Sequence, residues 1–196
     1  MSIVNCPECS GTVEDTAITC VHCGAALIIA SADSTALPPF FAVSILKLAV
    51  MSFFTLGLYE LYWFYRNWQR IRVCKRRDIK PSLRALFGFF FCYACFKEIR
   101  DGGLQRGIRP APPIGVLTAG WILLNLTWKL PPPFSLVSLL SWVFLLPVQS
   151  YANRINLEAF PAHDVNSRFT IWNWVWIAVG GIFLLLAVIG LLMPTE

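Results

Sequence analysis

The stretch from Phe40 to Arg77 limits most strongly how this chain can fold. It is apolar over most of its length, then becomes densely aromatic, and ends in a run of positive charge. This order is typical of a chain that leaves a bilayer interior through the headgroups towards an anionic leaflet. Hydrophobic residues make up 57% of the 196 residues and charged residues only 14%, whereas soluble domains are about one quarter charged. We therefore expect an integral membrane protein.

Two C-x2-C pairs precede this stretch, Cys6 with Cys9 and Cys20 with Cys23, and ten residues separate them. Such pairs can bring four thiolates to one tetrahedral metal ion. We predict a small zinc ribbon over residues 1–26, with one structural Zn²⁺ and no open coordination position. Two disulfides are the alternative in an oxidising compartment, but this spacing suits tetrahedral coordination better.

The predicted ribbon is acidic, with Glu8, Glu14 and Asp15, and residues 1–39 contain no Lys or Arg. Phosphates would be repelled by such a surface, so we expect a protein partner and no nucleic acid. Residues 27–39 are interpreted as a linker that ends at two prolines, and residues 40–196 as a helical membrane domain.

Three features argue that residues 40–65 are not a simple transmembrane helix. Lys47 and Glu60 are intramembrane charges, Thr55-Leu56-Gly57 is a potential break, and an aromatic cluster follows it. We predict a helix, a break at Gly57 and an interfacial helix. Lys47 is expected to extend towards the headgroups, and pairing with Glu60 is the alternative.

The string from Thr55 to Tyr65, T-x-G-x-Y-x-x-Y-W-x-Y, resembles a signature of small bacterial inner-membrane proteins of unknown function, several with an N-terminal zinc ribbon. Residues 84–99 and 168–174 are also similar to that group. The resemblance implies a multi-pass protein of the bacterial inner membrane and brings no known reaction.

A basic segment follows the aromatic cluster, and residues 66–84 contain eight Lys or Arg residues. Such a segment either binds anionic lipid headgroups or only sets the topology. The candidate headgroup contacts are Arg66, Arg70, Arg72, Lys75, Arg76 and Arg77.

Three transmembrane helices are predicted further along the chain, at 114–130, 134–150 and 172–193. The first two form a hairpin around three prolines. The apolar segment 83–96 is too short to span a bilayer and is predicted to be re-entrant or interfacial. Its Cys92 and Cys95 are expected to be buried without metal or redox chemistry. The predicted fold class is an all-α integral membrane protein with a small N-terminal zinc ribbon.

Basic residues place loops 66–84, 97–113 and 151–170 in the cytoplasm. The ribbon lies outside if residues 40–65 span the bilayer, and in the cytoplasm if they do not. We favour the cytoplasm, which preserves zinc thiolates better than an oxidising periplasm.

A non-enzymatic membrane adaptor or accessory protein is the function that these features favour. A subunit of a transporter or channel is the second possibility, although Lys47, Glu60 and Asn125 are few polar groups for a transport path. A membrane enzyme is the third. His163 and Asp164 are adjacent, but no nucleophile motif accompanies them, so we interpret them as part of a solvated loop.

Overall fold

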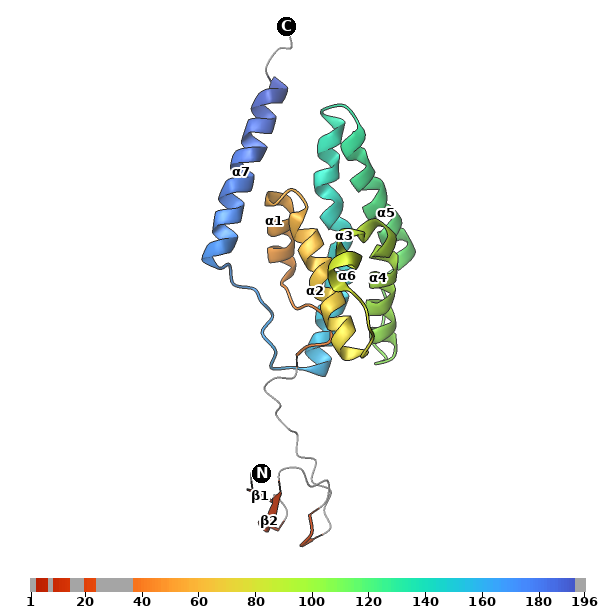
Figure 1. Cartoon of the computed structure of the whole chain (residues 1–196), viewed down its shortest axis with the longest axis vertical. Helices are drawn as coiled ribbons and strands as arrows, with labels where there is room; N and C mark the ends of the chain where they lie inside the picture. The colour runs from red at the N-terminus through yellow and green to blue at the C-terminus, as the bar shows by residue number, and fades with distance from the viewer. Residues whose placement is uncertain (1–2, 7–8, 15–19, 24–36, 193–196) are drawn as a thin grey trace. The chain divides into compact units, whose positions relative to one another are not determined.

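The computed structural model describes residues 3–6, 9–14, 20–23 and 37–192, and it is mostly helical (Figure 1). Contacts divide the chain into two units, Met1–Leu37 and Pro38–Glu196. Residues 27–36 of the predicted linker and residues 24–26 of the predicted ribbon lie outside the described residues. Each unit is described below by itself.

The N-terminal unit contains a two-stranded antiparallel sheet. Strand β1 (Ile3–Asn5) pairs with β2 (Thr12–Glu14), with Val4 opposite Val13. The turn between them is closed by hydrogen bonds from Cys6 N to Gly11 O and from Ser10 N to Cys6 O, each 2.8 Å long. The Val13 side chain is buried together with two cysteines, Cys6 and Cys20.

The second unit begins with an extended, buried segment at residues 40–43. Helix α1 (Ile45–Phe54) follows, and the Ser44 hydroxyl caps it by accepting from Lys47 N at 3.2 Å. A break then leads into helix α2 (Leu58–Cys74), whose N-cap Gly57 has a φ of 88° that glycine adopts without strain. The predicted break at Gly57 is confirmed. Helices α1 and α2 pack against each other, so residues 40–65 do not form one continuous helix.

Amide side chains satisfy the backbone of the extended segment 40–43. The Asn156 side chain accepts from Phe40 N and donates to Phe40 O, both at 3.0 Å. The Asn67 side chain accepts from Phe41 N at 3.1 Å, and Gln149 donates to Phe41 O at 3.0 Å. All three amide residues are fully buried. The segment therefore crosses the interior without leaving these backbone groups unpaired. We call this set of contacts the amide clamp.

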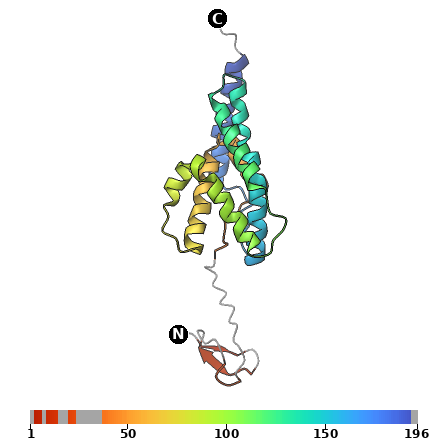
Figure 2. The same ribbon diagram turned by 90° about the vertical axis from the view of Figure 1, so that its right-hand side faces the viewer.

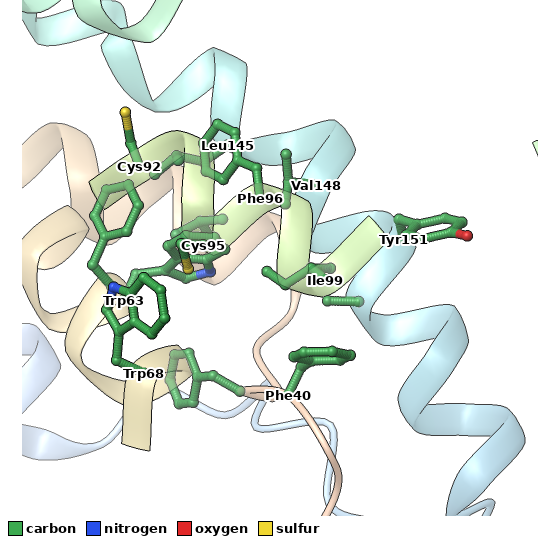
Figure 3. Packing of buried hydrophobic residues seen from close by; sticks show 14 of the residues in the cluster. Phe40, Trp63, Trp68, Cys92, Cys95, Phe96, Ile99, Leu145, Val148 and Tyr151 are labelled. Atoms are coloured by element: carbon green, nitrogen blue, oxygen red, sulfur yellow. The ribbon is translucent and has the colours of Figure 1, made fainter. Parts of the chain in front are cut away.

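Helix α2 supplies one wall of the hydrophobic core. Its buried residues recur at intervals of three and four, which places them on one face of the helix. Trp63 on this face packs with Phe96 of helix α4 (Gly88–Leu104; Figure 3). The ring of the neighbouring Phe64 stacks on that of Phe96, with ring centroids 6.0 Å apart. Cys92 and Cys95 are buried in the same cluster, as predicted.

The apolar segment 83–96 is not a single element, because Phe87 separates helix α3 (Pro81–Leu86) from α4. Helix α4 also continues to Leu104, into residues that the sequence assigned to a loop. Helices α2 and α6 likewise continue into the predicted loops 66–84 and 151–170. Helical periodicity persists through these polar residues because one face of each helix stays buried against the core.

The proline hairpin joins two packed segments. Helix α5 (Ile114–Leu126) and the 3-10 turn η1 (Thr127–Lys129) precede it, and the 3-10 helix η2 (Phe134–Phe144) follows and continues into α6 (Leu145–Ala159). Helix α5 and η2 are in contact, which confirms the hairpin (Figure 1).

Two helices among the described residues are long and apolar enough to span a membrane, Phe134–Ala159 and Ile171–Leu191. The third predicted span is not confirmed, because α5 has only 13 residues and a bilayer core requires about 20. Helix α7 (Ile171–Leu192) contributes the second span. Only 6% of its most apolar stretch is buried in the protein. Most of the apolar side chains of this helix are therefore exposed on the protein surface.

Helix α7 contacts α1 (Figure 1). At this contact Gly180 lies directly against the backbone of Phe54. A Cβ at Gly180 would lie 1.4 Å from the carbonyl oxygen of Phe54, whereas a Cβ at Gly190 would meet nothing within 4 Å. Close helix approach therefore depends on Gly180.

We expect Gly180→Ala to displace α7 and to lower the free energy of unfolding by about 1–3 kcal/mol, since the backbone of Phe54 cannot move aside as a side chain would. Gly190→Ala is the matched control on the same helix and should be neutral or slightly stabilising. Thermal unfolding of both variants in detergent micelles measures the difference. Equal unfolding temperatures for the two variants would contradict the close contact.

Candidate metal centre and buried charged groups

Four thiols converge in the N-terminal unit. The Sγ atoms of Cys6, Cys9, Cys20 and Cys23 all lie within 4.8 Å of one another. Cys6 and Cys23 are 3.8 Å apart and Cys9 and Cys20 are 3.6 Å apart. Four sulfurs at about 2.3 Å from a common centre are separated by about 3.8 Å in a tetrahedron. The cysteines can therefore hold a metal ion, and in this structure they are free thiols and not disulfides.

Local packing fixes the two C-x2-C pairs against each other. A Cβ at Gly11 would lie 2.6 Å from the Cδ2 atom of His22 and 3.3 Å from the Cys9 sulfur. Glycine at this position therefore lets the second pair approach the first. The His22 side chain itself is exposed and lies outside the four-thiol group.

The Cys20 thiol is set up to ionise. Although burial opposes ionisation, backbone N–H groups of His22 and Cys23 donate to its sulfur, and they lower its pKa to about 6. The His22 bond is 3.4 Å long. A thiolate is the form that binds metal, so the backbone of this turn favours the ligand state.

Glu60 is 3% exposed and lies between three elements of the second unit. One carboxylate oxygen accepts from Nε1 of Trp121 on α5 at 2.5 Å, and the other accepts from the Ser141 hydroxyl on η2 at 2.7 Å. The neutral donors of the hairpin therefore stabilise this carboxylate, which joins α2 to both arms of the hairpin.

Lys47 is also 3% exposed, and it does not pair with Glu60. Its ammonium donates to the Asn166 side chain at 2.8 Å and to the carbonyl oxygen of Arg168 at 2.7 Å. It therefore fastens α1 to the loop before α7. Lys47 lines a cavity of about 450 Å³, whose aromatic walls include Tyr59 and Trp176.

The six candidate headgroup residues have different surroundings. Arg66 lies over the rings of Phe41 and Tyr62, and one buried guanidinium nitrogen of Arg70 has no hydrogen-bond partner. Lys75 and Arg77 both pair with Glu98 of α4. The remaining two, Arg72 and Arg76, are exposed. The C-terminal ends of α2, α4 and α6 lie at the same end of this unit (Figures 1 and 2).

His163 and Asp164 do not form a catalytic pair. Nδ1 of His163 lies 2.6 Å from the carbonyl oxygen of Phe160, and the Asp164 carboxylate accepts from Asn166 N at 2.7 Å. Each side chain binds the backbone of its own loop.

The partners Trp121 and Ser141 were missed by reasoning from the sequence, and so was the amide clamp. Comparison of the chain with protein-family models, with curated proteins and with solved structures finds no match. The function is therefore inferred from this geometry.

Glu60→Gln should retain most of the stability, because its amide oxygen can accept from Trp121 and its amide nitrogen can donate to the rotated Ser141 hydroxyl. Glu60→Leu leaves both donors unpaired and should lower the free energy of unfolding by about 2–4 kcal/mol. Denaturant titration in micelles measures both. A leucine variant as stable as the glutamine variant would refute this role for the carboxylate.

Glu98 gives a pH-dependent contribution to stability. Burial raises the pKa of its carboxyl, but Lys75 and Arg77 outweigh burial and hold the pKa below the ordinary value of 4.5. The stabilisation should be complete above pH 4.5 and disappear as the pH falls through the lower folded-state pKa.

Glu98→Gln should therefore cost about 0.5–1 kcal/mol at neutral pH and nothing at the lowest pH. Unfolding across a pH series measures this difference from the native chain. Asp78→Asn removes the same charge from an exposed residue that forms no ion pair among the described residues. A constant cost for Glu98→Gln at every pH would exclude the ion pairs as its cause.

Proposed function

We propose that this protein is a membrane-anchored adaptor, with a structural zinc ribbon that contacts a protein partner. The observation that carries this proposal is the group of four converging thiols in a unit separate from the helical body. Zinc is the metal that four cysteines in two C-x2-C pairs most often bind. Four protein ligands fill its tetrahedral shell, so the ion would hold the fold together and would not bind a substrate.

The surface of the ribbon supports protein contact. Val21 is 82% exposed and lies between Cys20 and Cys23 in the sequence. Because the core of a protein interface is more apolar than the rest of the surface, this exposed side chain suits contact with a protein. The exposed acidic residue Glu14 at the end of β2 is unfavourable for phosphate, which argues against a nucleic acid partner.

The helical body is proposed to anchor the ribbon in a bacterial inner membrane. The exposed apolar surface of α7 and the hairpin arm Phe134–Ala159 support insertion. Exposed basic residues of α2 and of the turn after it, Arg72 and Arg76, suit contact with anionic headgroups. We place the basic C-terminal end of α2 in the cytoplasm. Because α1 and α2 are separate helices that pack against each other and do not form one span, the chain before α1 starts on the same side, and the ribbon is cytoplasmic as well.

Transport is less well supported. A transport path needs ionisable groups that can exchange partners. Both oxygens of Glu60 already accept hydrogen bonds, and the Lys47 ammonium is bound to the loop before α7.

The purified full chain should contain one zinc per molecule by elemental analysis, and Cys6→Ser or Cys20→Ser should abolish it. Cys74→Ser is the matched control, because Cys74 is exposed at the end of α2. A photo-crosslinker at Val21 should capture one discrete partner in cells, and the Cys20→Ser background should lose that adduct. Zinc content unchanged by Cys20→Ser would disprove the metal site.

The same cysteines test the location of the ribbon. After zinc chelation, an impermeant thiol reagent should label them only in permeabilised cells. Labelling in intact cells would place the ribbon outside. Crosslinks from Val21 that persist after zinc removal would show that partner binding does not require the zinc-bound fold of the ribbon.

A further inference from the structure

Three arginines surround a hollow at the end of the body where α4 and α6 terminate. Arg106 and Arg109 belong to the connection after α4, and Arg154 belongs to α6. They line a cavity of about 520 Å³ together with Gly107, Ile108, Leu157 and Glu158. We call this cavity the arginine pocket. None of its residues was among the headgroup candidates from the sequence.

The fold builds the pocket by ending α4 sharply. Gly107 has a φ of 75°, and Ile108 N donates back to Gly103 O at 3.0 Å. The carbonyl oxygen of Ile108 accepts from the Tyr151 hydroxyl of α6 at 2.8 Å. The connection is therefore fastened to α6, and the arginines of both segments are brought together.

Backbone carbonyls hold two of the three guanidinium groups. Nη1 of Arg106 donates to Gly102 O, and Nη2 of Arg154 donates to Arg109 O, each at 2.8 Å. A guanidinium has five N–H donors, so each keeps further donors for a ligand. Because the two side chains are already oriented, less conformational entropy is lost on binding.

The pocket carries an excess of positive charge. Elsewhere at this end Lys75 and Arg77 pair with Glu98, and Lys97 and Arg100 pair with Asp101. Among the described residues, no carboxylate lies within 4.0 Å of the pocket's guanidinium groups, since all four ion pairs lie elsewhere. Glu158 lines the pocket and leaves an excess of two positive charges.

We propose that the arginine pocket binds a phosphate ester. Guanidinium groups recognise phosphate through paired N–H donors, and three that converge on one hollow can contact several oxygens of one group. A lipid headgroup and a soluble phosphate share this chemistry. Basic pockets between the helices of membrane proteins commonly bind anionic headgroups. The proposal does not depend on the zinc ribbon.

The test uses the purified, delipidated full chain. Calorimetry measures binding of glycerol 3-phosphate in detergent, and native mass spectrometry counts phosphatidylglycerol retained from nanodiscs that also contain phosphatidylcholine. We expect saturable binding of at least one of them. Arg109→Gln with Arg154→Gln should weaken it by about tenfold or more. Arg72→Gln with Arg76→Gln removes the same charge from α2 and the turn after it, and should change binding less than about twofold.

Glu158→Gln gives a prediction of opposite sign. Removal of the one carboxylate should tighten binding by about two- to fivefold, since the repulsion of a phosphate is lost at an exposed site. This variant keeps the pocket testable if the double arginine variant does not fold. Circular dichroism checks the fold of each variant.

The two ligands distinguish the sources. Retention of phosphatidylglycerol without binding of glycerol 3-phosphate assigns a lipid headgroup, and binding of both assigns a phosphate site open to soluble esters. Equal losses of affinity in the two double arginine variants would show that binding depends only on total positive charge, and would overturn the proposal of a phosphate site in the arginine pocket. Absence of saturable binding of either ligand would overturn it as well.

Discussion

The helical body depends on the amide clamp around residues 40–43. A buried extended segment has backbone groups that no neighbouring strand satisfies, and each unpaired group would cost a few kcal/mol. Asn67 and Asn156 each accept a backbone N–H, and Asn156 and Gln149 donate to carbonyl oxygens. The same Gln149 accepts from the Trp63 indole at 2.5 Å. Helices α2 and α6 are thereby positioned on the segment, and the aromatic core is completed around them.

The interior charges follow the same rule as the clamp. Lys47 and Glu60 are both buried, yet neutral groups satisfy each of them separately. A buried ion pair often loses in desolvation what it gains in attraction. Separate solvation by carbonyl, indole and hydroxyl groups instead connects each charge to a different part of the chain. Glu60 holds the hairpin, and Lys47 holds the loop that leads to α7.

Local features were predictable from the sequence. The four cysteines are recognisable because their spacing alone specifies a tetrahedral site, and Gly57 is recognisable because few other residues start a helix at positive φ. Burial of Cys92 followed from its apolar neighbours. These predictions needed no knowledge of which helices meet.

Long-range features were not predictable in the same way. Glu60 binds Trp121 and Ser141, which follow it by 61 and 81 residues in the sequence. Helical periodicity does not predict contacts between residues so far apart. The third span was expected because an apolar run of sufficient length was present. Hydropathy cannot show that α5 ends at Leu126 and continues only as a 3-10 turn.

The amide clamp has a mechanical consequence, because the N-terminal ribbon precedes the clamped segment in the chain. The ribbon is covalently continuous with the clamped segment, so a pull on the ribbon reaches the body at the buried residues Pro38 and Pro39, directly before the segment. Asn156 binds Phe40, Asn67 and Gln149 both bind Phe41, and Asn153 binds Val43. A pull on the segment is therefore resisted by side chains of two different helices, Asn67 of α2 and the other three of α6. Tension from a bound partner would therefore be shared by α2 and α6.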